Sequence, residues 1–401
     1  MSSPSPSTPP SGSLPPLVEP AGALSREEVA RYSRHLIIPN VGTCGQKRIR
    51  NARVLVIGAG GLGSPTLLYL AAAGVGTIGI VEFDEVDESN LQRQVIHGRA
   101  DVGRPKAHSA RDSIVGINER VDVRLHEFAL DRSNAVDLFR QYDLILDGTD
   151  NFATRYLVND AAILAGKPYV WGSIYRFEGQ VSVFWEAAPN GCGLNYRDLY
   201  PQAPPPGMVP SCAEGGVLGV LCASIGSIMA TEAIKLITGI GEPLLGRLMI
   251  YDALAMTYRT IRLRRDPYRK PVTELVDYDT FCGVVSDDAE VAASGATLTA
   301  PELASLLDSG DDIALIDVRE PVEWDIVHFP GATLIPKDRI LSGDSLAELP
   351  RDRPIILYCK TGIRSAEVLA ALTRAGFSDA AHLEGGIAAW ANQVDPKMPV
   401  Y

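Results

Sequence analysis

Short apolar runs alternate with longer amphipathic stretches over residues 53–147. The runs predict buried strands, and the stretches predict helices, which repeat apolar positions every three or four residues. The expected strands are 53–57, 77–82, 122–127 and 144–147, and the helices between them are 63–73, 106–118 and 135–140. Regular alternation of strand and helix predicts a parallel, doubly wound α/β sheet.

Two further apolar runs, 169–174 and 180–185, predict strands, the second antiparallel after a turn at Glu178 and Gly179. A long apolar stretch at 216–236 predicts a helix, and 248–252 predicts the strand that closes this domain. The stretch is long enough to cross a membrane. It is rich in small residues, contains Glu232 and runs into Lys235, so we expect a helix buried against protein and no membrane partner.

Four segments are expected along the chain. Residues 1–22 are mostly Pro and Ser and should be disordered, because they lack the apolar residues of a core. A first domain spans 23–283 and begins with a helix capped by Ser25 and Glu28. A linker of small and acidic residues at 284–296 leads to a smaller α/β domain at 297–401. Its expected strands are 314–318 and 355–358, and its helices begin at Pro301, Ser365 and Gly386.

Composition narrows the class of protein. The chain has 401 residues, 46% of them apolar, which is enough for two cores. A formal charge of −12 argues against nucleic acid or an anionic membrane as the main partner, because both attract cationic surfaces. The six cysteines have no regular spacing and no signal peptide precedes the domains, so we expect the reducing cytoplasm. They are Cys44, Cys192, Cys212, Cys222, Cys282 and Cys359.

A glycine motif follows the first strand of the doubly wound pattern. It reads G-A-G-G-L-G, with Gly58, Gly60, Gly61 and Gly63 at the fingerprint positions. Such glycines let backbone N–H groups approach a phosphate at a helix N-terminus. Glu82 ends the next strand, where an acid can bind ribose hydroxyls, so the pattern predicts a nucleotide site rather than a packing turn.

Polar segments at two later positions favour ATP over a dinucleotide. The segment S-N-L-Q-R-Q at 89–94 and Lys106 offer an amide and two cations to a polyphosphate, although solvated loop charges would explain them equally well alone. The segment D-G-T-D-N at 147–151 ends a strand, and Asp150 there could hold Mg²⁺ between phosphates or simply cap a helix.

Cys359 directly follows the apolar run that predicts a strand at 355–358. A loop at a strand end, with a helix about to start and Arg364 beside it, would stabilise a thiolate or persulfide anion. The loop residues Lys360, Thr361, Gly362, Ile363 and Arg364 are therefore expected to surround the sulfur. Cys359 is the predicted nucleophile rather than an inert core cysteine.

The motifs of the first domain, in this order, resemble those of the MoeB/ThiF family of ubiquitin-activating-enzyme-like adenylyltransferases, which have a Rossmann-like fold. They include R-Y-S-R-H at 31–35, the glycine motif, S-N-L-Q-R-Q, D-G-T-D-N and P-S-C-A-E-G-G-V-L-G at 210–219. The resemblance implies that Glu82 and Asp84 lie beside the nucleoside and that Arg34 reaches into the partner's site of a homodimer. The remaining residues that it places around ATP are Ser89, Asn90, Leu91, Gln92, Arg93, Lys106, Asp150 and Asn151.

The resemblance further implies a reaction with ATP and Mg²⁺. The C-terminal glycine carboxylate of a small ubiquitin-like sulfur carrier, ending in Gly-Gly, would be adenylated, with release of pyrophosphate. That carboxylate is already a nucleophile, so Arg93 and Asp150 would act through positioning and charge neutralisation, without a general base.

One departure concerns zinc. Members of this family commonly hold a structural zinc ion with two C-x-x-C pairs. Here the first pair reads N-Y-R-D at 195–198 and the second reads D-T-F-C at 279–282, and Cys192 has no C-x-x-C partner. Tetrahedral zinc sites seldom tolerate this loss of thiols. We expect no structural zinc, with packing or Asp-based hydrogen bonds in its place.

The second domain resembles a rhodanese domain over 297–398, on the segments L-I-D-V-R, E-W-D-I-V-H-F-P-G-A, C-K-T-G-I-R-S and G-G-I-A-A-W. We expect Asp317 and Arg319 to organise the fold near the site, and His328 to be structural. Cys212, in the P-S-C-A-E-G-G segment, could form a transient acyl disulfide or thioester, or could simply be a buried small residue. Cys44 and Cys222 are expected to take no part.

Together the two resemblances predict a cytoplasmic, homodimeric enzyme that is both adenylyltransferase and sulfurtransferase. Sulfur on Cys359, loaded from thiosulfate or a persulfidated protein, would displace AMP from the carrier and leave a thiocarboxylate. Molybdopterin, cysteine and thiamine biosynthesis and tRNA thiolation all use such a product, and the choice among these pathways stays open from the sequence. Two alternatives stay open from the sequence. One is a non-catalytic scaffold that binds carriers, and the other is an NAD-dependent oxidoreductase, which the glycine motif would also fit.

Overall fold

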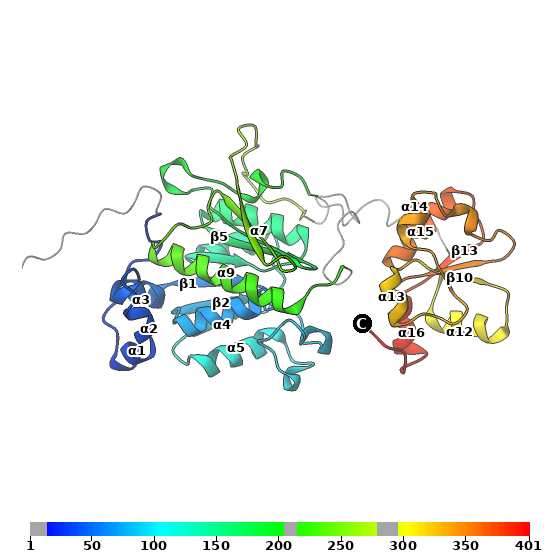
Figure 1. Ribbon diagram of the computed structural model, residues 1–401, viewed down its shortest axis with the longest axis horizontal. Coiled ribbons are helices and arrows are strands. Elements are labelled where there is room, and N and C mark those ends of the chain that lie inside the picture. The colour runs from blue at the N-terminus through cyan, green and yellow to red at the C-terminus, as the bar shows by residue number, and fades with distance from the viewer. Residues whose placement is uncertain (1–13, 204–214, 279–295) are drawn as a thin grey trace, which may run out of the picture. The chain divides into compact units, whose positions relative to one another are not determined.

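The computed structural model describes residues 14–203, 215–278 and 296–401. The chain divides into two compact units, Met1–Val284 and Val285–Tyr401 (Figure 1). Each unit has its own sheet and its own cores, and each is described by itself below.

The first unit is built on an eight-stranded sheet in the order β3-β2-β1-β4-β5-β6-β7-β8. Its first five strands are parallel, and β6, β7 and β8 continue it in antiparallel fashion. The strands are β1 (Arg53–Ile57), β2 (Thr77–Val81), β3 (Asp122–His126), β4 (Leu144–Asp147), β5 (Tyr169–Tyr175), β6 (Glu178–Phe184), β7 (Arg247–Asp252) and β8 (Thr257–Arg262). The predicted doubly wound parallel sheet is confirmed, and β1 and β4 flank the point where the strand order reverses.

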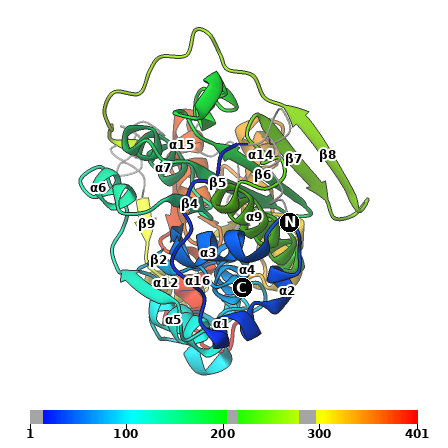
Figure 2. The ribbon, with the colours of Figure 1, turned by 90° about the vertical axis from the view of Figure 1, so that its left-hand side faces the viewer.

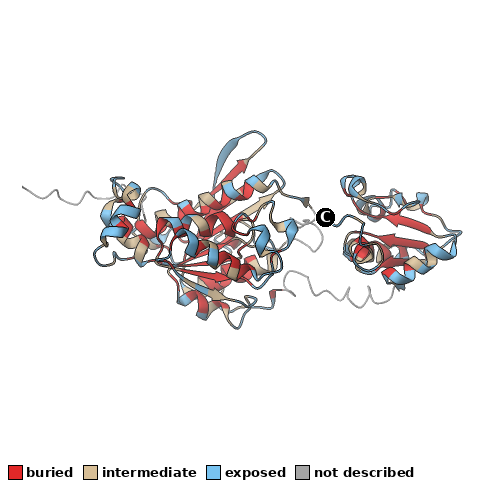
Figure 3. Cartoon of the chain, turned by 90° about the horizontal axis from the view of Figure 1, so that it is seen from below, coloured by how far each residue is buried: buried red, intermediate tan, exposed pale blue. Residues whose placement is uncertain are grey.

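Helices cover both faces of this sheet, which explains why its strands β1, β2 and β4 read as apolar runs. Val54 and Val56 of β1 join a core with α4 and α9, whereas Leu55 and Ile57 join a second core with α6 and α7 (Figure 2). Buried strands lie inside helices whose outer faces are exposed (Figure 3). The helices are α1 (Arg26–Arg31), α2 (Ser33–Leu36), α3 (Gly42–Asn51), α4 (Gly63–Ala73), α5 (Lys106–Ile117), α6 (Ala135–Arg140), α7 (Phe152–Ala165) and α9 (Gly219–Thr238).

Helix α9 is the long apolar stretch of the sequence. By length and composition alone it could cross a membrane, with a mean hydropathy of 1.6. In this structure it packs against α3, α4, β5 and β6. Glu232, only 3% exposed, accepts hydrogen bonds from Lys235 and from the backbone N–H of Leu244. Its buried residues and its buried carboxylate therefore have protein partners.

Two expectations need correction. The hairpin turn lies at Arg176 and Phe177, because Glu178 already pairs with Tyr175 in the sheet. Residues 14–22 are ordered rather than part of a disordered tail, since Val18 is buried in the core and the N–H of Leu17 donates to the Leu236 carbonyl. Residues 1–13 lie outside the described residues, as does the predicted linker up to residue 295. Strand β8 and helix α7 are additions to the predicted elements.

The second unit has a five-stranded, all-parallel sheet in the order β11-β10-β12-β13-β9. Its strands are β9 (Ala296–Leu298), β10 (Ala314–Asp317), β11 (Thr333–Leu334), β12 (Ile355–Tyr358) and β13 (Ala380–Leu383). Its helices are α12 (Ala300–Ser309), α13 (Pro321–Ile326), α14 (Lys337–Leu341), α15 (Ile363–Arg374) and α16 (Gly386–Gln393). The expected smaller α/β domain is thus present, and Cys359 stands at the carboxyl end of the central strand β12.

Candidate functional site

A cavity of about 330 Å³ opens at the carboxyl ends of β1, β2 and β4, where open α/β sheets bind ligands. It brings together residues that are far apart in the sequence. The predicted nucleotide-binding residues that line it are Gly58, Gly60, Gly61, Glu82, Asp84, Arg93, Lys106, Asp150 and Asn151. This arrangement offers two cations and two exposed carboxylates around a glycine-rich turn.

The glycine turn depends on a close approach within the motif. A Cβ on Gly63 would lie 2.0 Å from the carbonyl oxygen of Gly58, so no larger residue fits there. Gly58 itself has a φ of +88°, which favours glycine. Gly63 starts α4 and does not line the cavity, so its contribution is to the shape of the turn.

Glu82 organises this turn from the end of β2. One carboxylate oxygen accepts the N–H of Ala59 at 2.9 Å, and the other accepts the N–H groups of Phe83 and Asp84 at 2.9 and 3.0 Å. The side chain is 7% exposed. Asp84 is much more exposed and pairs with Lys106 at 3.1 Å. The geometry therefore favours Asp84 over Glu82 as the carboxylate that meets a ribose.

His97 holds the same turn from its other side, a contact that the sequence did not suggest. Its Nε2 lies 3.1 Å from the Ala59 carbonyl, and its Nδ1 lies 2.8 Å from the hydroxyl of Ser109, one turn after Lys106 on α5. Burial lowers the pKa of His97 below its ordinary value. A neutral imidazole thus braces the glycine turn against the helix that carries Lys106.

The end of β4 supplies the acidic side of the cavity. Asp147 is fully buried, and burial raises its pKa although Thr149 donates two hydrogen bonds to it. The cap of α7 is Asn151, whose side chain accepts the N–H of Thr154 at 2.8 Å, so Asp150 is not the cap. Asp150 lines the cavity and is exposed.

Arg155 is a cavity residue that the sequence reading missed. Its Nε and Nη2 donate to the carbonyl of Thr149 at 3.2 and 3.1 Å, and its guanidinium lies over the Phe152 ring. It follows the cap Asn151 by one helical turn, a spacing that could have identified it. The cavity therefore has a third cation beside Arg93 and Lys106.

Several predicted residues do not line this cavity. Ser89 and Asn90 belong to a short 3₁₀ helix, where the Ser89 carbonyl accepts from Arg93 at 3.0 Å and the Asn90 side chain accepts the N–H of Asp87 at 3.2 Å. Leu91 and Gln92 follow in the same loop, and Arg34 lies on α2. The structure thus gives the Ser89 carbonyl a role in holding the Arg93 side chain in place, whereas the Asn90 side chain caps the 3₁₀ helix.

In the second unit, the loop after β12 surrounds a sulfur atom. The Sγ of Cys359 accepts the N–H of Gly362 at 3.1 Å and lies 3.6 Å from the hydroxyl of Ser365. The N–H groups of Ile387 and Ala388, at the start of α16, donate to the carbonyls of Cys359 and Lys360. These bonds direct the carbonyls of Cys359 and Lys360 toward α16, while the N–H of Gly362 faces the sulfur, as a loop that stabilises an anion requires.

The sequence predicted that Arg364 lies beside the sulfur, and the structure shows it in an ion pair with an acidic side chain. Its two terminal nitrogens donate to Glu323 of α13 at 2.6 and 2.8 Å. Burial would raise the pKa of Glu323, but the hydrogen bonds from Arg364 and the Glu320 backbone lower it below its ordinary value. Tyr401 donates to the same carboxylate at 2.9 Å. Arg364 therefore ties the loop to α13.

Asp317 and Arg319 form a fully buried ion pair at 2.6 Å beneath the loop. Arg319 also donates to the Val327 carbonyl at 2.7 Å and to Tyr401 at 2.6 Å. His328 stacks on Trp324, with ring centroids 3.9 Å apart, and contacts the Trp324 carbonyl. These contacts are those expected of residues that organise the fold.

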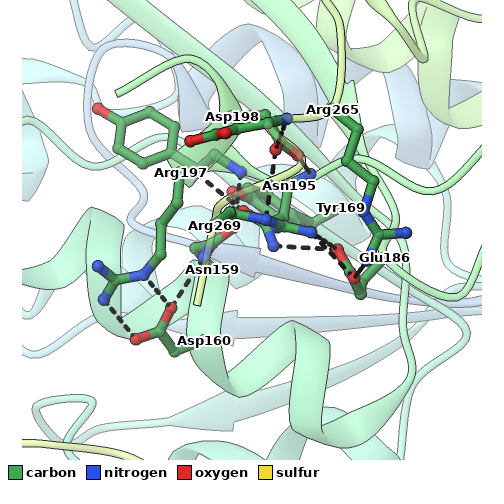
Figure 4. Close-up of polar contacts among 11 residues, drawn as sticks. Asn159, Asp160, Tyr169, Glu186, Asn195, Arg197, Asp198, Arg265 and Arg269 are labelled. Atoms are coloured by element: carbon green, nitrogen blue, oxygen red, sulfur yellow. Dashed lines mark hydrogen bonds and ion pairs between the residues drawn. The ribbon is translucent and has the colours of Figure 1, made fainter. Parts of the chain in front are cut away.

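Residues 195–198 stand where the family commonly has its first C-x-x-C pair. Charged hydrogen bonds hold this corner of the structure (Figure 4). Asp198 accepts the N–H groups of Asn195 and Asp266 and pairs with Arg269 at 3.3 Å. Arg269 also pairs with Glu186 at 2.8 Å. The expected Asp-based hydrogen bonds are thus present. Residues 279–282, where the second pair would be, lie outside the described residues.

The other predicted thiols differ in their settings. Cys44 and Cys192 are exposed and Cys222 is buried near Gly61. Cys212 lies outside the described residues, so its role stays a prediction. Within 14–203, 215–278 and 296–401, no group of three or more His, Cys, Asp or Glu side chains could hold a metal ion by itself.

Two family models match the chain: the ThiF family over residues 32–272 and the Rhodanese-like domain over residues 299–393. The probable adenylyltransferase/sulfurtransferase MoeZ of Mycobacterium tuberculosis (strain ATCC 25618 / H37Rv) is 76% identical over 391 residues, which cover 98% of this chain and 100% of the relative. Adenylyltransferase and sulfurtransferase MOCS3 of Drosophila ananassae is 39% identical over 399 residues. The match covers 94% of this chain and 86% of the relative. Sulfur carrier protein adenylyltransferase of Thermus thermophilus is 52% identical over 268 residues, 65% of this chain and 98% of the relative.

Solved structures share the fold of the first unit. Escherichia coli MccB with ATP has a TM-score of 0.50 at 21% identity and covers 60% of this chain and 73% of that chain. The structure of PaaA has a TM-score of 0.51 at 24% identity, and the match covers 61% of this chain and 76% of that chain. The motif-based resemblances to both families are confirmed by the family models, and relatives that span nearly the whole chain are named for two activities.

Proposed function

The chain belongs to the ThiF family and carries a rhodanese-like domain, and we infer that it adenylates a sulfur carrier protein with ATP and then transfers sulfur to it. The observation that supports this most directly is the presence in one chain of a glycine-turn cavity with three cations and a cysteine loop of the persulfide type. The oxidoreductase and scaffold alternatives are not favoured by these relatives.

We propose that the cavity binds ATP with its triphosphate on the glycine turn. Lys106, Arg93 and Arg155 neutralise the phosphates, and Asp84 meets the ribose. The carboxylate of the carrier attacks the α-phosphorus and pyrophosphate leaves. Because the attacking oxygen is already anionic, the residues act by binding and by offsetting charge at the α-phosphate.

Asp150 is the residue that would hold Mg²⁺. Asp84 and Asp150 are both exposed in the cavity, but Asp84 is paired with Lys106. Asp150 therefore fits an ion that binds proteins through one or two carboxylates and takes its other ligands from water and phosphates. The ion would supply charge neutralisation to the phosphates. Replacing Asp150 by Asn should raise the Mg²⁺ concentration needed for ATP–pyrophosphate exchange, which is measured by isotope incorporation.

Sulfur transfer is proposed to run through Cys359. Its thiolate attacks the outer sulfur of thiosulfate, sulfite leaves, and a persulfide remains on Cys359. The terminal persulfide sulfur then attacks the carrier acyl adenylate and expels AMP, which leaves an acyl disulfide. A second thiol attacks the Cys359 sulfur and releases the thiocarboxylate, and an external thiol reduces the resulting disulfide. Cys212 is proposed as that second thiol.

Two activities on two units give a direct experiment. Cys359→Ala should keep ATP–pyrophosphate exchange with a carrier and abolish thiocarboxylate formation, as read by mass spectrometry of the carrier. Asp150→Asn should impair the exchange and keep sulfur transfer from thiosulfate to cyanide. The proposal is wrong if Cys359→Ala still forms thiocarboxylate, or if no exchange occurs with any carrier.

Three further proposals concern the setting of the enzyme. We propose a homodimer in which Arg34 serves the partner's site, a cytoplasmic location, and thiosulfate or a persulfidated protein as sulfur donor. A nucleophilic thiol persists best in a reducing compartment. Mixing Arg34→Ala with Asp150→Asn chains should restore exchange activity above either variant alone, because a mixed dimer would hold one intact site. No restoration would refute shared sites.

A further inference from the structure

Two buried polar residues lie behind the Cys359 sulfur and have no part in the reaction described so far. Ser365, on the first turn of α15, is fully buried, and His382, on β13, is 8% exposed. The Ser365 hydroxyl is 3.6 Å from Sγ and 3.3 Å from the Nδ1 of His382. These contacts form a chain from the imidazole to the nucleophile.

We propose that His382, through the hydroxyl of Ser365, positions the Cys359 sulfur, with Ser365 donating its hydrogen to the anionic sulfur. This inference rests on the proposed role of Cys359. Ser365 touches the reacting atom, whereas His382 acts only through Ser365 and is a positioning residue.

The Ser365 hydroxyl can donate only one hydrogen. Three groups surround this hydroxyl: Sγ, the Nδ1 of His382, and the Gly362 carbonyl at 3.0 Å. A bare Nδ1 would take this hydrogen for itself. If Nδ1 carries its own proton, it donates to the Ser365 oxygen and leaves the hydroxyl hydrogen to the other two groups. A thiolate or persulfide then outcompetes the neutral carbonyl, because hydrogen bonds to anions are stronger.

The surroundings keep His382 neutral, so the position of its one proton matters. Burial lowers the pKa of His382, and Glu384 in the turn after β13 opposes this shift. From β12 the neighbouring residue in register is Leu357, and from β9 it is Thr297. The titratable group that it reaches through Ser365 is Cys359 itself. A neutral imidazole with its proton on Nδ1 thus fits every contact that the structure gives.

Packing alone would also place a side chain at this position, and a pair of variants separates the two roles. Asn has a side-chain amide nitrogen where His has Nδ1, so His382→Asn keeps the donor to Ser365. His382→Leu keeps the volume and removes the donor. Both variants are made in the full chain, and sulfur transfer from thiosulfate to cyanide is measured at pH 8.

His382→Leu should lower kcat about tenfold with the KM for thiosulfate unchanged within about twofold, the loss expected for one hydrogen bond to an anion. His382→Asn should stay within about threefold of the unmodified chain. Ser365→Ala should lose about tenfold, and His382→Leu added to it should lose little more, because both changes remove the same hydrogen bond.

Three results would overturn the inference. They are an unchanged kcat in His382→Leu, an equal loss in the Asn and Leu variants, or additive losses in the double variant. Cys359→Ala is measured beside them: if it retained transfer, the role of Cys359 itself would be wrong. Thermal unfolding of the second unit in each variant shows that the compared chains are folded, and exchange of pyrophosphate into ATP should not change in any of them.

Discussion

At the scale of single residues, two carboxylates at the end of β2 have separate tasks. Glu82 accepts three backbone N–H groups, whereas Asp84 is exposed and paired with Lys106. The family resemblance implied that both lie beside the nucleoside. Their contacts assign Glu82 to the shape of the glycine turn and leave Asp84 in the cavity beside Lys106.

Glu82→Gln and Asp84→Asn should therefore fail in different ways. Glu82→Gln puts an N–H₂ group against backbone donors, and we expect a loss of about 2 kcal/mol in the free energy of unfolding. Asp84→Asn should change stability by less than about 0.5 kcal/mol and raise the KM for ATP about tenfold. Urea unfolding and exchange kinetics measure the two effects. Equal effects on KM would mean that both carboxylates meet the nucleotide.

His97 gives the first unit a dependence on pH. Its folded pKa lies below the ordinary value of 6.5, so the folded state favours the neutral form. The stability that this contributes is complete above about pH 6.5 and is lost as the pH falls through the folded pKa. His97→Gln keeps a donor for the Ala59 carbonyl but does not titrate. We expect its unfolding midpoint to fall less between pH 7 and pH 5 than that of the unmodified chain, and equal slopes would contradict this.

The residues that sequence reasoning found and those that it missed differ in how their contacts are made. The glycine turn and the cysteine loop are contiguous, so their spacing alone identifies them. His97 meets Ala59 across 38 positions, and Ser365 meets His382 across 17. A lone buried histidine carries no local signal, and only the fold reveals its partner.

At the scale of elements, charged hydrogen bonds hold the corner between Asn195 and Arg269. The side chain of Arg269 is 8% exposed and that of Asp198 is fully buried. Arg269 also forms an ion pair with Glu186. Strand β8 marks the opposite case, since all six of its residues are exposed and no apolar alternation announced it. Apolar runs in the sequence predicted the buried strands β1, β2 and β4, whereas the exposed strand β8 has no such run and was missed.

Arg269→Met should lower the free energy of unfolding of the first unit by roughly 3 kcal/mol, because it leaves the buried Asp198 carboxylate without its partner. Arg265→Met is the matched control: it bonds the same Glu186 but is mostly exposed, and about 0.5 kcal/mol is expected. The metal chelator EDTA should leave the unfolding temperature unchanged. A lower unfolding temperature in EDTA would point to a structural metal ion.

At the scale of the whole molecule, the two units have separate cores, and each is proposed to bind its own reactant. ATP should therefore raise the stability of the first unit alone, by about 2.7 kcal/mol at a concentration of 100 times its Kd. Differential scanning calorimetry of the full chain should show two transitions, only one of which moves with ATP. A single transition, or an equal shift of both, would mean that the units unfold together.

Helix α9 has a consequence for how the chain is synthesised. Its packing partners α3, α4, β5 and β6 all precede it in the sequence, so the ribosome has translated them before this 20-residue apolar helix emerges. We expect the helix to meet an already translated part of the sheet and its helices as it leaves the exit tunnel. A circular permutant that began at residue 215 would reverse this order and present the same helix first, with nothing yet made to cover it. The order of translation is thus part of how this helix reaches its place in the fold.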